Sequence, residues 1–302
     1  MIINTGLRTD IPAFYWTWFK NRIREGFVLV RNPFFPQVVT KYRLDPTVVD
    51  LMVFCTKNPL RVIDDLALLD PFRQLWFVSI TGYGKDIEPH VPDKHRVIEG
   101  FRRLSEKVGA HNMVWRFDPI LLTDRYTEEY QLRAFSSIAE SLRGYTNTVV
   151  ISFVDLYAKV RRNFPELREV PHEATLRLSK QMVSIAAACR MRVKSCAEGD
   201  YLSAVSVDTS GCMTREVFER AIGQPLRKLP KVRNRSTCDC LLIGDIGTYD
   251  SCPHLCRYCY ANADKSRILK SFKEHDPESP LLIGHLRPED IVKEAKQVSW
   301  LI

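Results

Sequence analysis

The sequence predicts an α/β protein of repeated β-α units that form a complete or partial (β/α) TIM-like barrel. Short apolar runs rich in β-branched and aromatic residues alternate along the chain with segments of helical periodicity. Polar and charged residues directly follow most of these runs. The chain has 302 residues, 45% of them hydrophobic, which is enough for a continuous buried core.

The expected strands are eight short apolar runs. In chain order they cover residues 1–3, 27–30, 51–55, 75–80, 113–117, 148–153, 191–194 and 241–246. Continuous apolar runs are typical of parallel strands buried on both faces, and eight of them with right-handed crossovers would close into a barrel. Residues 31–50 are poor in helical pattern, so an incomplete barrel is equally compatible with the sequence.

Two helices are expected with particular clarity, over residues 92–108 and 171–190. Each carries apolar residues at steps of four, three and four positions, which places these residues on one buried face. Pro92 and Pro171 suit the first turn of each helix, where the missing N–H of proline needs no partner. We expect residues 1–195 to form the barrel body. Residues 196–302 would form a cysteine-rich C-terminal part that carries the closing strand.

Polar residues stand at the expected carboxyl ends of several strands. They are Arg8, Thr9, Asp10, Arg31, Asn32, Thr56, Lys57, Asn58, Thr81, Arg116, Asp118 and Asp155. In β/α barrels these ends converge on one mouth, where function concentrates. We therefore take Arg116, Asp118 and Asp155 as candidate catalytic residues. The alternative is that these residues are polar because turns are polar in any fold.

Charge and hydropathy limit the partners and the compartment. The net charge of +8 favours anionic partners, nucleic acid included, but the basic residues are scattered and such clusters are commonly solvated faces. No apolar stretch approaches the roughly 18–20 residues that cross a bilayer. Residues 1–10 lack the features of a signal peptide, so we expect a cytoplasmic protein that does not bind membranes.

Nine cysteines are many for such a chain, and seven of them follow Ser195. A reducing compartment disfavours disulfides and favours metal or redox roles. Cys252, Cys256 and Cys259 lie within eight residues, at a spacing that suits three corners of one [4Fe–4S] cluster and leaves the fourth iron open. The alternative is tetrahedral zinc, with His254 as a fourth ligand.

Four further cysteines form a second possible metal set: Cys196, Cys212, Cys238 and Cys240. Four thiolates complete the ligands of an auxiliary [4Fe–4S] cluster, but they also suit a structural zinc ion. Some of them could instead be ordinary buried thiols. Cys55 lies in an apolar strand and Cys189 on an apolar helical stripe, so both are interpreted as core residues.

The Cys-x3-Cys-x2-Cys loop, with Tyr258 before its last cysteine, resembles the motif of the radical S-adenosylmethionine (radical SAM) superfamily. The whole chain resembles a bacterial family of unknown function with a radical-SAM-like cysteine cluster at the C-terminus. The segments that carry this likeness are RTDIPAFY (8–15), GFVLVRNP (26–33), TKNP (56–59), TGYG (81–84), WRFDPI (115–120), SFVD (152–155) and SCAE (195–198). The resemblance implies iron–sulfur binding in the bacterial cytoplasm and a radical-SAM-type barrel in permuted order.

The resemblance also implies that S-adenosylmethionine (SAM) binds the open iron and is cleaved to a radical by one electron, from a donor such as flavodoxin or ferredoxin. Radical SAM enzymes usually offer a Gly-Gly-Glu-like strand end to the methionyl amine, and this chain has no Gly-Gly pair. Thr9 and Asp10 are candidates to replace it, with Arg8 or Arg31 for the carboxylate. Tyr258 is assigned to cofactor binding with them.

The leading interpretation is therefore a radical SAM-like enzyme that acts on an unknown substrate. One alternative is a non-catalytic iron–sulfur protein that transfers electrons or senses through its cluster. Another is an enzyme that modifies or repairs nucleic acid, because some radical SAM enzymes act on such substrates.

Overall fold

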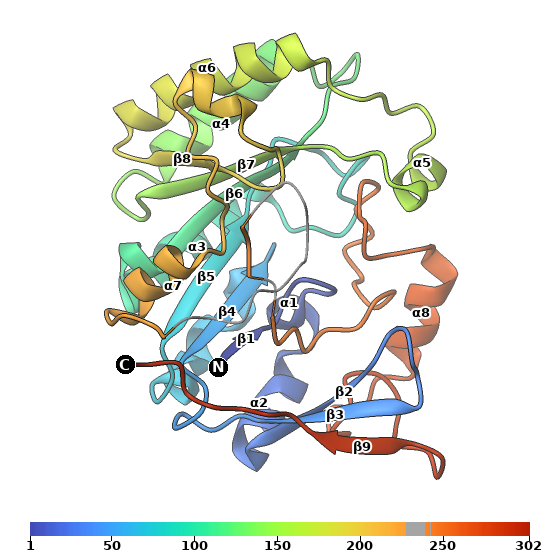
Figure 1. The fold of residues 1–302 in the computed structure, drawn as a ribbon. Coiled ribbons are helices and arrows are strands. Elements are labelled where there is room, and N and C mark those ends of the chain that lie inside the picture. Colours follow the sequence, from blue (N-terminus) through green and yellow to red (C-terminus); the bar gives the residue numbers. More distant parts are fainter. Residues whose placement is uncertain (228–238, 242) are drawn as a thin grey trace.

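A parallel sheet of six strands forms the centre of the protein in a computed structural model, which describes residues 1–227, 239–241 and 243–302 (Figure 1). The strand order is β1-β4-β5-β6-β7-β8, and all neighbours run parallel. The strands are β1 (Ile2–Asn4), β4 (Leu51–Thr56), β5 (Gln74–Ser79), β6 (Met113–Ile120), β7 (Thr148–Phe153) and β8 (Arg192–Ser195). The predicted α/β class and these six strands are confirmed.

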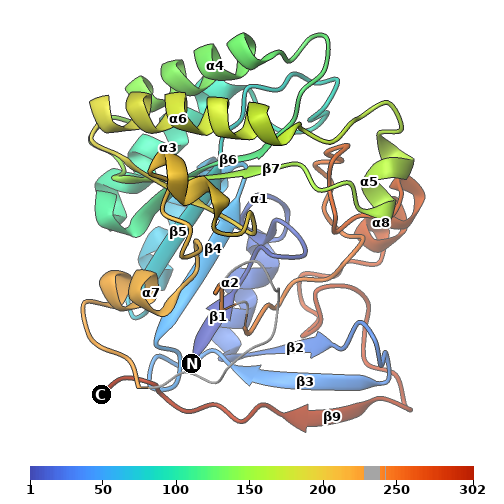
Figure 2. The same ribbon diagram turned by 45° about the horizontal axis from the view of Figure 1, so that its top comes forward.

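Alternate strand residues pack into two separate cores. Ile3, Phe54 and Trp76 face one core, whereas Val53 and Phe77 face the other. The first core is covered by α2 (Trp16–Glu25), α3 (Lys94–Val108), α4 (Glu128–Ser141) and α6 (His172–Ala188). The second lies under α7 (Arg215–Ile222), on the opposite side of the sheet (Figure 2).

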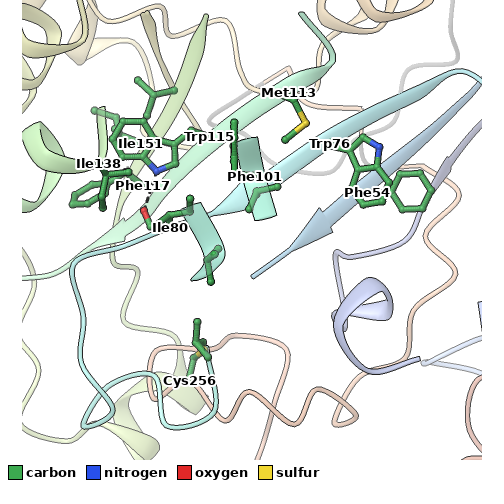
Figure 3. Packing of buried hydrophobic residues seen from close by; sticks show 14 of the residues in the cluster. Phe54, Trp76, Ile80, Phe101, Met113, Trp115, Phe117, Ile138, Ile151 and Cys256 are labelled. Atoms are coloured by element: carbon green, nitrogen blue, oxygen red, sulfur yellow. Dashed lines mark hydrogen bonds between the residues drawn. The ribbon is translucent and has the colours of Figure 1, made fainter. Parts of the chain in front are cut away.

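Aromatic rings fill the first core (Figure 3). The rings of Phe54 and Trp76 stack with their centroids 3.9 Å apart. The indole of Trp115 packs against Phe135 and donates a hydrogen bond of 2.9 Å to the carbonyl of Ile80, so its one polar atom has a partner.

The two expected helices form, with one correction to their starts. α3 begins at Lys94 and is capped by Asp93, whose carboxylate accepts from the amide of His95, and α6 begins at His172. Pro92 and Pro171 therefore precede the first turn instead of lying in it. The shorter helices are α1 (Ile11–Phe14), α5 (Ala158–Asn163), α8 (Lys265–Lys273) and the 3-10 turns Pro59–Arg61, Ile63–Leu69, Ala110–Asn112 and Tyr201–Val205.

A second sheet corrects the prediction for residues 27–30. This run is β2 (Phe27–Arg31), which pairs antiparallel with β3 (Val38–Arg43), and β3 pairs parallel with β9 (Ile291–Glu294). The connection between β2 and β3 is too short for a parallel crossover, so the chain turns back as a hairpin. Residues 27–31 thus form no part of the parallel sheet.

The parallel sheet is open, so the closed barrel is not found. Beyond β1, Asp245 forms a parallel bridge with Asn4, and beyond β8, Asp208 forms one with Lys194. No pairing joins these two edges within the residues described. The first of these bridges places Asp245, from the expected closing strand at residues 241–246, beside β1. Its described part is not a strand, because Gly244 has a φ of +65° and interrupts the extended backbone.

Within residues 1–227, 239–241 and 243–302, no helix combines the length and apolar character needed to cross a bilayer.

Candidate metal and cofactor site

A cavity of about 250 Å³ lies where the parallel strands end. Its wall includes residues from the carboxyl ends of β4, β6 and β7, the segment after β1 and the cysteine loop near the C-terminus. The predicted site residues that line it are Arg8, Thr9, Asp10, Arg116, Asp118, Asp155, Tyr258, Cys196, Cys212, Cys240, Cys252, Cys256 and Cys259. The structure therefore brings together nearly all the residues chosen from the sequence.

Two predicted site residues are not in this group. Arg31 lies at the end of β2 in the small sheet, and its guanidinium pairs with both carboxylate oxygens of Asp290. The assignment of Arg31 to cofactor binding is therefore corrected, because β2 does not belong to the parallel sheet. Cys238 lies outside the described residues.

A hydrogen bond within the loop holds the segment that carries Cys252, Cys256 and Cys259. The side-chain amide of Asn262 donates to the Cys252 carbonyl at 3.0 Å. Burial raises the pKa of all three thiols. Binding a metal at these sulfurs must therefore release protons, as thiolate ligation generally does.

The hydroxyl of Tyr258 donates to Glu88, a buried carboxylate. Glu88 also accepts from Lys57 Nζ at 2.9 Å and from the hydroxyl of Thr81 at 2.9 Å. Burial alone would raise the pKa of Glu88, but the charges of Lys57 and Lys94 hold it below its ordinary value. Tyr258 is thus fixed against a charged, hydrogen-bonded network behind the cavity wall.

Arg116 and Asp118, two of the candidate catalytic residues, form an ion pair on β6. The hydroxyl of Ser152 donates to the other oxygen of Asp118. Burial disfavours the charge of Arg116, yet Asp118 raises its pKa above the ordinary value. Asp155, the third candidate, lines the cavity and accepts from the hydroxyl of Tyr157 at 2.9 Å.

The three predicted N-terminal cofactor residues differ in what they can still bind. Arg8 pairs with Asp245. Asp10 caps α1 by accepting from the amide of Ala13, and its other oxygen accepts from the amide of Lys57. The hydroxyl of Thr9 is buried and has no hydrogen-bond partner among the described residues.

Two more buried polar atoms on this cavity share that property, namely His254 Nδ1 and Asn262 Oδ1. A buried polar atom without a partner costs about 1–3 kcal/mol, so these three atoms are candidates for bonds to a polar ligand. Sequence reasoning missed Glu88 and Asn262. Neither ends a strand nor belongs to the cysteine motif, so the pattern held no signal for them.

The second cysteine set also gathers at the cavity. The sulfurs of Cys196, Cys212 and Cys240 all lie within 4.8 Å of one another. In the described part of the chain, no other three cysteine, histidine or carboxylate side chains bring their ligand atoms this close together.

Fold and site together define an α/β protein with a cysteine-lined cavity at the carboxyl ends of its parallel strands. The chain belongs to the family described as "Domain of unknown function (DUF1848)", whose model matches residues 2–261. The match covers the parallel sheet and both cysteine sets, and it ends before α8 and β9. The comparison with curated proteins found no match to the chain.

Proposed function

We propose that the protein is a radical SAM-like enzyme in which Cys252, Cys256 and Cys259 bind a [4Fe–4S] cluster. The observation that carries this proposal is the position of the three cysteines on one loop that opens onto the cavity beside three unpartnered polar atoms. When bound, the cluster supplies the electron for reductive cleavage of SAM, and the unknown substrate would occupy the remaining cavity.

The three sulfurs are not gathered around one point, as the ligands of a single ion would be. A cubane carries each thiolate on its own iron, so the sulfurs stand further apart than thiolates that share one ion. The sulfurs of this loop, all described, are not within 4.8 Å of one another. Three thiolates leave one iron of a cubane without a protein ligand, as binding a cosubstrate requires.

The unpartnered atoms suit the methionyl amine of SAM. His254 Nε2 lies 2.8 Å from the Asp10 carboxylate, so in the neutral ring Nε2 donates and Nδ1 accepts. Asn262 Oδ1 is an acceptor, and the hydroxyl of Thr9 can accept as well. An amine that binds the open iron through its nitrogen lone pair keeps two N–H donors. We therefore assign these donors to acceptors among Thr9, His254 and Asn262, in place of the Asp10 carboxylate, which is already bonded.

Anaerobic reconstitution tests this function. About four irons and four sulfides per chain should bind, and reduction with dithionite in the presence of SAM should release 5′-deoxyadenosine. Cys256→Ala should lose the cluster, whereas Cys189→Ala should keep it, because Cys189 lies outside the cavity wall at the end of α6. A cluster that leaves SAM intact with dithionite, and with a flavodoxin or ferredoxin as donor, would instead favour an electron-transfer or sensor protein.

A specific surface feature favours nucleic acid as the substrate class. Tyr157 and Tyr260 line the cavity, are about half exposed and have ring centroids 6.4 Å apart. Lys159 lies over the ring of a third exposed tyrosine, Tyr249. Exposed aromatic rings beside cations are typical of sites where unpaired bases stack.

Fluorescence anisotropy with single-stranded RNA and DNA tests this second candidate. Binding should weaken steeply with salt, and Tyr157→Ala should weaken it further at constant salt. The matched control is Tyr42→Ala on β3, which is outside the cavity wall. Absence of salt-dependent binding would remove nucleic acid from consideration.

A further inference from the structure

Three cysteines from separate segments meet at the wall of the cavity. Cys196 follows β8, Cys212 precedes α7, and Cys240 lies in the segment that leads to the Cys252 loop. The sulfur of Cys212 lies 3.4 Å from that of Cys196 and 3.6 Å from that of Cys240. None of these contacts follows from closeness in sequence, since the folded sheet brings the three segments together.

We propose that Cys196, Cys212 and Cys240 bind a single divalent metal ion, and that this ion is zinc. Tetrahedral zinc with Zn–S bonds of about 2.3 Å places its sulfurs roughly 3.8 Å apart, close to the two separations observed here. An auxiliary cubane would hold the same cysteines on different irons and further apart. The two cysteine sets therefore hold two different kinds of metal centre.

The surroundings of the triad suit negatively charged sulfur. The backbone amides of Cys212 and Met213 lie 3.2 Å and 3.5 Å from the Cys240 sulfur, towards which they donate. The guanidinium of Arg116 lies 3.6 Å from the Cys212 sulfur. Three thiolates on a divalent ion leave a net charge of −1, which these donors and the nearby cation stabilise.

The turn before Cys212 depends on glycine for this geometry. Gly211 has a φ of +100°, a conformation that other residues rarely adopt. A Cβ at this position would also come within 3.0 Å of the Cys240 sulfur. The backbone therefore reaches the sulfur closely enough to donate to it only because residue 211 has no side chain.

The proposed ion would join three parts of the structure that the site needs. It links the end of β8 and the start of α7 to the segment that leads to the Cys252 loop. Arg116, held by Asp118, extends between the ion and the rest of the cavity wall. The ion would thus fix the cavity wall, and binding it would contribute folding free energy directly.

Metal analysis of the anaerobically purified protein tests the proposal. We expect about one zinc per chain in the wild type, independent of cluster iron. Cys212→Ser should reduce the zinc several-fold and leave the cluster iron unchanged. Cys189 is a buried cysteine outside the cavity wall, so Cys189→Ser should keep the zinc.

Cobalt replacement provides a measurement that needs no variant to fold. Zinc-depleted wild type should bind one Co²⁺ with strong sulfur-to-cobalt absorption. The proposal is overturned if Cys212→Ser loses iron in place of zinc, which would indicate a second cubane. It is equally overturned if zinc-depleted wild type binds no Co²⁺, or if mass spectrometry shows a Cys196–Cys212 disulfide in the purified protein.

Discussion

His254 Nε2 lies 2.8 Å from Oδ2 of Asp10, and this contact joins the cysteine loop to the N-terminal segment. The same carboxylate accepts from the amide of Ala13 at 3.0 Å and from the amide of Lys57 at 2.7 Å. One buried side chain therefore connects the start of α1, the end of β4 and the loop that carries the proposed cluster. The position of the loop depends on Asp10 even though Asp10 belongs to no cysteine motif.

Asp10→Ala should destabilise the protein more than the loss of an ordinary helix cap. It removes the cap of α1 and leaves the amide of Lys57 and the ring of His254 without their acceptor, so we expect a loss of about 2–4 kcal/mol. Urea unfolding measures this loss. Asp93→Ala is the matched control, because Asp93 caps α3 with one bond and should cost about 1 kcal/mol. Equal losses would mean that Asp10 acts only as a cap.

Phe54→Ala should cost about 3–5 kcal/mol of unfolding free energy, as large-to-small changes in a packed core do. Phe54 is fully buried on β4 and stacks on Trp76 (Figure 3). Phe34 is 81% exposed, so Phe34→Ala should change stability by no more than about 0.5 kcal/mol. Similar losses for the two variants would contradict the packing described here.

The parallel sheet could be predicted because its strands are local apolar runs of the right length. The small sheet could not, since β9 pairs with β3 from the other end of the chain, and no local pattern encodes a partner so distant. The run at residues 27–30 is as apolar as the strands of the large sheet. Only the short connection to β3 distinguishes it, and that strand was itself not predicted.

The cysteine motif and the strand-end residues of the site could likewise be predicted from the sequence. Which of these side chains remain available to a ligand could not, because that depends on partners set by tertiary contacts. Arg8 is paired with Asp245 and Asp10 is bonded to His254, whereas the neighbouring Thr9 hydroxyl has no described partner. Adjacent polar residues at the end of one strand therefore differ in whether their side chains are available to a ligand.

The ion pair of Arg31 with Asp290 should give the small sheet a distinct acid sensitivity. The hydrogen bond from Arg31 lowers the pKa of Asp290 to about 2, below its value of about 3.9 in an unfolded chain. The pair therefore stabilises the fold fully above about pH 5, and this contribution is lost as pH falls towards 2.

Urea unfolding of wild type and Asp290→Asn as a function of pH measures this effect. The difference in unfolding free energy should be constant above about pH 5 and should shrink below about pH 4. Cluster iron should be the same in both proteins, because Arg31 lies outside the cavity wall. A difference that does not vary with pH would show that the ion pair contributes nothing.

The buried pair of Lys57 and Glu88 should behave as one unit in a double-mutant cycle. Removing one partner leaves the other charge buried without its counterion, so Lys57→Met and Glu88→Gln should each cost about 3–5 kcal/mol. The double variant removes both charges of the pair. Its loss should therefore be about 1–3 kcal/mol smaller than the sum of the single losses.

A second readout separates this pair from a purely structural ion pair. Glu88 accepts from the hydroxyl of Tyr258, which lies between Cys256 and Cys259 in sequence. Glu88→Gln keeps an acceptor for that hydroxyl, whereas Glu88→Ala does not. Of these two variants, Glu88→Ala alone should therefore lower the amount of iron retained after anaerobic reconstitution. Tyr258→Phe should lower it to a similar extent, because it breaks the same bond from the other side. If all three variants retain wild-type iron, the bond between Tyr258 and Glu88 does not hold the cysteine loop in place.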